Sequence, residues 1–87
     1  MYKQKYLTMK QIAAAIGAPE HAARIVVARC FNDLPTAHVM PSGATRAHKG
    51  YEVFAVVAEA QRTLKYYSDD MATKMMAMAI PARGVAV

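Results

Sequence analysis

The sequence predicts a small, mostly α-helical domain with one β-hairpin and an added helix near the C-terminus. Three observations lead to this prediction. Capping residues and Gly17 delimit two helices in close succession within residues 9–31. Two segments with alternating side chains, 36–40 and 51–56, flank a loop. A last segment, 69–80, has apolar residues at helical spacing.

The first helix has clear signals at both ends. Thr8 followed by Gln11 has the spacing of a capping box, in which each side chain satisfies the other residue's backbone N–H. Apolar residues up to Ile16 then share one face, and Gly17 favours the left-handed conformation that ends a helix. We therefore predict a short helix over 9–16.

A second helix is predicted over 19–31. Pro19 suits the first turn of a helix, and Glu20 suits the positive end of the helix dipole. One side carries the apolar stripe Ala23, Val26, Val27 and Cys30. The other side carries polar side chains and is expected to be free, namely Glu20, His21 and Arg24.

A hairpin follows this pair of helices. Pro35 ends the second helix, and the segments 36–40 and 51–56 are predicted to be its strands. The loop between them, "MPSGATRAHKG" (40–50), combines turn residues with basic residues. Its side chains that can carry positive charge are Arg46, His48 and Lys49.

Two more helices are expected after the hairpin. The first spans 53–67, and the second spans 69–80 after a cap formed by Ser68, Asp69 and Asp70. The predicted units are a domain over 1–67, a Met-rich helix over 68–80 and a flexible tail over 81–87. The apolar side chains of that helix either pack on their own domain or form a homodimer or partner surface: Met71, Met75, Met76, Met78 and Ile80.

Composition and charge restrict the functions that are possible for this chain. The 87 residues suffice for one domain, with 55% hydrophobic and 20% charged residues. Residues 1–50 hold seven basic and two acidic residues, whereas residues 51–87 hold four of each, so the formal charge of +5 is N-terminal. A basic half of this kind favours a polyanionic partner.

Other function classes have little support in the sequence. No apolar run approaches the roughly 20 residues that span a bilayer, and the first residues lack a signal-peptide core, so we expect a cytoplasmic protein. Cys30 is the single cysteine. No catalytic pair of carboxylates, no metal-spaced His pair and no Gly-rich phosphate motif occurs. We therefore expect no catalytic residues, no metal and no cofactor.

The order helix, turn, helix, hairpin is that of a winged helix-turn-helix, in which the second helix enters the major groove of DNA. Arg24 is the best candidate for contact with base edges, with His21 and Glu20 beside it as further hydrogen-bonding groups. Phosphate contacts are expected from Lys10 in the first helix and from the loop residues Arg46, His48 and Lys49. The N-terminal Lys3 and Lys5 have a weaker claim to such contacts.

The segment "YLTMKQIAAAIGAPEHAAR" resembles the start of the MerR-like and excisionase-like winged helices of phages and mobile elements. The match is carried by Tyr6, Leu7, Thr8, Gln11, Ala13, Ile16 and Gly17. With the hairpin and the helix after it, the resemblance spans about residues 6 to 66. It implies a regulator or an excisionase-type architectural protein that binds double-stranded DNA in a bacterial host cell, as a dimer or a cooperative oligomer.

A second hypothesis belongs to another class of protein. The small Ala23, the apolar Ile25 and the Met-rich helix are also compatible with a phage-encoded inhibitor that binds a host protein. Such a protein would reuse the fold to block a host nucleic-acid machine, for example a CRISPR surveillance complex. It would have no measurable affinity for duplex DNA at moderate salt.

Overall fold

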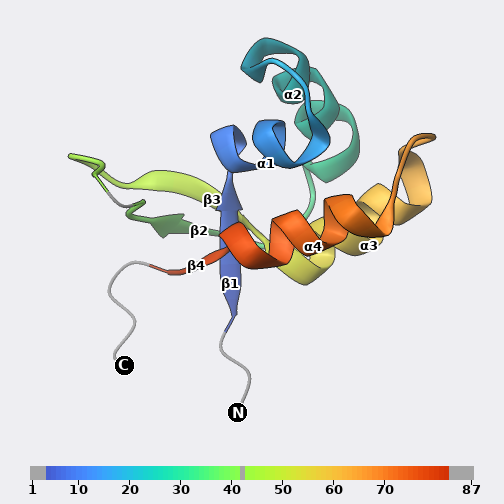
Figure 1. Cartoon of the computed structure of the whole chain (residues 1–87). Helices are drawn as coiled ribbons and strands as arrows, with labels where there is room; N and C mark the ends of the chain where they lie inside the picture. The colour runs from blue at the N-terminus through green and yellow to red at the C-terminus, as the bar shows by residue number, and fades with distance from the viewer. Residues whose placement is uncertain (1–3, 42, 83–87) are drawn as a thin grey trace.

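The computed structural model describes residues 4–41 and 43–82 and contains helices that pack against an antiparallel sheet (Figure 1). The strands lie in the order β2-β3-β1-β4. The hairpin predicted from the sequence is therefore present, but it is part of a larger sheet, and the domain is of mixed α and β type. The elements in chain order are β1 (Lys5–Thr8), α1 (Met9–Ile16), α2 (Glu20–Val26), η1 (Val27–Phe31), β2 (Thr36–Val39), β3 (His48–Glu52), α3 (Val53–Thr63), α4 (Asp69–Met78) and β4 (Ile80–Pro81).

Helix α1 has the predicted bounds and the predicted caps. The Thr8 hydroxyl accepts from the Gln11 backbone N–H at 3.3 Å, and the Gln11 side-chain oxygen accepts from the Thr8 N–H at 2.9 Å. Gly17 ends the helix in the left-handed conformation, with φ of 71°. Both ends are determined by residues within a few positions, which explains why the sequence predicted them.

The second predicted helix is divided into two helical forms. Helix α2 begins at Glu20, directly after Pro19, and ends at Val26. The chain then continues without a break as the π-helical segment η1, which ends at Phe31. The wider π-helical turn brings the Phe31 side chain into the core, where it is fully buried.

The hairpin strands differ from the predicted ones, since β2 ends at Val39 and β3 spans His48–Glu52. His48 and Lys49, which the sequence assigned to the loop, therefore belong to β3, and the segment 51–56 is not one strand. Helix α3 starts at Val53 because the carboxylate of Glu52 caps it, accepting from the N–H groups of Phe54 at 3.1 Å and Ala55 at 3.0 Å. The helix ends at Thr63 rather than at 67, where Leu64 takes an extended conformation. The strand prediction was wrong for residues 53–56, because the periodicity of a short apolar run does not distinguish a strand from a helix.

Two strands were not predicted. Strand β1 pairs with β3 on one side and with β4 on the other. Helix α4 begins with the Ser68 hydroxyl accepting from the Met71 N–H at 3.3 Å and ends at Met78, so Ile80 belongs to a strand and not to the predicted helix. Pro81, which was assigned to the tail, pairs with Lys5, while residues 83–87 of that tail lie outside the described residues.

The main core lies between the helices and the sheet. Every helix and the two central strands contribute to it (Figure 1). The largest fully buried side chains of the whole domain are those of Phe31, Leu7, Ile12, Met75, Val39 and Val56. Because α4 contributes Met71 and Met75 to this core, the C-terminal helix is an integral part of the fold.

Gly50 lies where strands β1 and β3 approach closely. A Cβ atom at Gly50 would lie 2.8 Å from the Cβ of Tyr6 and 3.2 Å from both methyl groups of Val39. We expect Gly50→Ala to lower the free energy of unfolding by about 1–3 kcal/mol, because the strands must move apart. The control is Gly43→Asn in the loop, where nothing lies within 4 Å and Asn tolerates the positive φ. Urea denaturation of the two variants measures this difference; equal stability of Gly50→Ala and the parent protein would contradict it.

Candidate nucleic-acid interface

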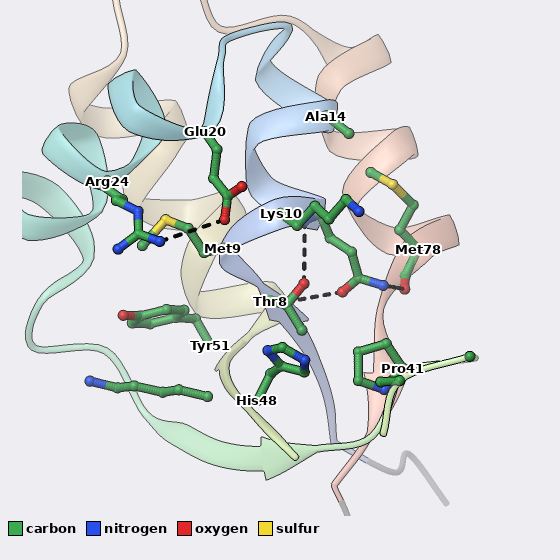
Figure 2. A pocket seen from close by; sticks show the side chains of 14 residues that line it. Thr8, Met9, Lys10, Ala14, Glu20, Arg24, Pro41, His48, Tyr51 and Met78 are labelled. Atoms are coloured by element: carbon green, nitrogen blue, oxygen red, sulfur yellow. Dashed lines mark hydrogen bonds and ion pairs between the residues drawn. The ribbon is translucent and has the colours of Figure 1, made fainter. Parts of the chain in front are cut away.

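A groove lies between the two N-terminal helices and the hairpin. Its volume is about 720 Å³, and its walls come from the start of α1, the start of α2, the loop after β2, the first residues of β3 and the end of α4. Figure 2 shows Arg24 and Glu20 above the groove and His48 and Pro41 below it. The surface is formed by segments that are far apart in the sequence.

The groove brings together five of the seven residues predicted to bind DNA: Lys10, Glu20, Arg24, His48 and Lys49. All five are exposed. Three of them are permanent cations, and Glu20 is the acidic residue among the described lining residues. The electrostatic field of these side chains attracts an anion that can approach from solvent.

The polar side chains on α2 pair with each other. A guanidinium nitrogen of Arg24 lies 3.8 Å from a carboxylate oxygen of Glu20, one helical turn away. The side chains are 69% and 52% exposed, respectively, so water screens this pair and its contribution to stability is small. Arg24 can therefore leave Glu20 for a partner in the groove at little cost.

Lys49 is oriented by an aromatic side chain of the same strand. Its Nζ atom lies 5.4 Å from the centre of the Tyr51 ring, and Tyr51 is buried in the core. The two residues are two positions apart in β3 and thus share one face of the sheet. Such a contact at an exposed site contributes about 0.5–1 kcal/mol, so the ring favours this position of the ammonium group at the groove.

The other predicted residues lie outside the groove lining. His21 is exposed on α2, and Arg46 is exposed in the hairpin loop. Lys5 is exposed at the start of β1, whereas Lys3 lies outside the described residues. The loop after β2 nevertheless contributes Gly43 and Ala44 to the groove wall, so Arg46 lies close to it in sequence.

Several lining residues were not predicted as site residues. The Gln11 side chain links two walls: its oxygen accepts from the Thr8 N–H, and its nitrogen donates to the Met78 carbonyl at 2.9 Å. Met78 and Tyr51 also line the groove. Met78 was predicted as part of a partner surface and not of this groove, because it is 67 positions from Gln11 and no local signal places the two together. The pairing of Lys49 with Tyr51 was not predicted either, because the sequence assigned Lys49 to the loop.

The five apolar residues assigned to an interface have different environments. Met71 and Met75 lie in the core of their own domain. Met78 is half-buried at the groove and Ile80 is half-buried in β4. Met76 is 46% exposed and is the member of this set that presents a large apolar side chain to solvent.

In residues 4–41 and 43–82, no cluster of three or more His, Cys, Asp or Glu side chains has the arrangement of a metal site. Within the same ranges, no helix has the length and apolar character needed to cross a membrane. Comparison with known protein families, curated proteins and solved structures finds no match to this chain.

Proposed function

We propose that the protein binds double-stranded DNA without catalysis, as a winged helix-turn-helix regulator or an excisionase-type architectural factor. In this proposal α1 and α2 form the helix-turn-helix, and β2, β3 and their loop form the wing. The observation that supports this proposal is the groove. It is lined by five residues that the sequence indicated as DNA contacts, and these residues come from three separate elements.

The proposed contacts fall into two classes. Arg24 reads base edges in the major groove, with Glu20 and His21 as additional hydrogen-bonding groups. The remaining basic side chains contact phosphates on both sides of α2, namely Lys10, Arg46, His48 and Lys49. In this proposal the protein acts in the cytoplasm of a bacterial host and binds DNA as a dimer on a palindrome or cooperatively on adjacent repeats.

Single substitutions in the groove distinguish the two classes of contact. We expect Arg24→Ala to change which sequences are bound, with a loss of about 1–3 kcal/mol on the preferred site, because a bidentate contact is lost. Lys49→Ala should weaken binding to all sequences alike and lower the salt slope by about 1. Selection from a random duplex library, followed by fluorescence anisotropy, measures both. If neither change altered binding to any duplex, the proposed function would be wrong.

The groove lining also supports a protein-binding inhibitor as the second candidate. Apolar side chains occupy much of its wall, including Met9, Pro41, Ala44 and Met78. Apolar walls with a few charged groups suit a peptide segment of a host protein. This candidate predicts a stable complex with that protein and no gel shift with duplex DNA at moderate salt; sequence preference at about 150 mM salt would exclude it as the main function.

A further inference from the structure

The outward face of α2 and η1 combines polar, small and apolar side chains. His21, Arg24, Ile25, Ala28 and Arg29 are all exposed. The opposite side of the same segment packs into the core through Ala23, Val27 and Phe31. Because the helix turns by about 100° per residue, Arg24 and Ile25 lie on either side of His21, and Ala28 lies one to two turns along the same face.

Ile25 is the unusual member of this face. Its side chain is 54% exposed, although isoleucine is among the residues most often buried. The other exposed large apolar residues named among the described ones belong to other segments: Met40 follows β2, Phe54 lies in α3, Tyr66 in the loop before α4, and Met76 in α4.

The residues around Ile25 indicate which kind of binding partner covers this side chain. Arg24 directly precedes Ile25, and Arg29 follows it by four positions, about one helical turn. A surface that covers Ile25 therefore meets positive charge on both sides while it offers one small apolar group. A protein surface that docks through apolar burial needs a contiguous patch of several hundred Å², which one side chain does not supply. The major groove of DNA meets both conditions, because the thymine methyl group lies between phosphate-lined walls.

We infer that Ile25 contacts the 5-methyl group of a thymine in the major groove, next to the base pair that Arg24 reads. This inference rests on the proposed function and adds a base preference to it. Arg24 supplies hydrogen bonds and Ile25 supplies apolar contact, so neighbouring residues read neighbouring base pairs. Ala28 has no long side chain, which lets this face approach the base edges closely.

The test removes the methyl group from the DNA and the side chain from the protein. A duplex of about 24 bp is first selected from a random library with the wild-type protein, which leaves room for two half-sites. Each thymine is then replaced in turn by deoxyuridine, which lacks only the 5-methyl group. At one position we expect wild-type affinity to fall about fourfold, the factor for burying one methyl-sized group.

The protein variants assign that loss to a residue. With Ile25→Ala, affinity for the thymine duplex should fall about fourfold, and the preference for thymine over deoxyuridine at that position should disappear. Ile25→Val keeps two methyl groups and should retain the preference. The control Met76→Ala removes another exposed apolar side chain, on α4, and should leave both values unchanged.

The outcomes separate this inference from the proposed function. If wild-type protein binds the selected duplex but no thymine is preferred over deoxyuridine, the role of Ile25 is wrong and DNA binding stands. The same conclusion follows if Ile25→Ala keeps the full preference. If the wild-type protein selects no duplex at low salt, the proposed function and the role of Ile25 both fail.

Discussion

Replacing Phe31 with Ala is expected to cause the largest loss of stability among single substitutions. The ring is fully buried at the end of η1 and contributes to the main core. Truncation of a buried phenylalanine costs about 3–5 kcal/mol, since apolar contacts are lost and a cavity remains. A domain of this size has a total stability of about 4–13 kcal/mol. We therefore expect Phe31→Ala to be partly unfolded at 37 °C or to melt far below the parent protein, as measured by circular dichroism.

The chain offers a matched control for this substitution. Phe54 is the second phenylalanine of the sequence, and it is 45% exposed at the start of α3. Phe54→Ala removes the same atoms but much less buried surface, so its cost should be clearly smaller. If Phe31→Ala were as stable as Phe54→Ala, the position of η1 against the core would be wrong.

Removing three cations from the groove is expected to have the largest effect on function. The variant Lys10→Ala, Arg24→Ala, Lys49→Ala eliminates the permanent positive charges of the lining. If Lys10 and Lys49 each neutralise one phosphate, the slope of log K against log salt should become less steep by about 1.8, and binding at about 150 mM salt should weaken by about 30-fold. The loss of Arg24 should add to this on the preferred site. Fluorescence anisotropy with a labelled duplex measures both quantities.

A second triple variant controls for the change in overall charge. Arg62, Lys65 and Lys74 are exposed, and none of them lines the groove. Their replacement by Ala removes the same three formal charges from the total of +5. Arg62 and Lys74 form exposed ion pairs with Glu59 and Asp70, whose loss costs little stability. Equal loss of affinity in the two triple variants would show that total charge, and not the groove, determines binding.

Local signals made part of the fold predictable. Helix α1 was predicted at its true bounds because Thr8, which caps it, and Gly17, which ends it, directly flank the helix in the sequence. Strand β1 was missed because it is only Lys5–Thr8, and its partner β3 is about forty residues away. Strand β4 consists of Ile80 and Pro81, which the sequence pattern assigned to the last helix and to the tail. Such pairings depend on tertiary contacts, which periodicity does not report.

Several residues of the candidate site were predictable from the sequence, but their arrangement around the groove was not. Arg24 and Glu20 were identified from their place on the free side of a helix, and Lys49 from its place in a basic loop. The contact of Lys49 with Tyr51 and the wall formed by Met78 needed the three-dimensional structure. The exposure of Ile25 also became visible only once the buried side of α2 was known.

The most direct test of DNA binding is a salt titration of the wild-type protein with a labelled random-sequence duplex of about 24 bp, from about 50 to 200 mM salt. If five or six basic side chains contact phosphates, log K should fall linearly with log salt with a slope of about −4.5 to −5.5. The groove variant should give a slope less steep by about 1.8, and the control triple variant should give the wild-type slope. Absence of binding at about 50 mM salt would contradict the proposal that this protein binds DNA.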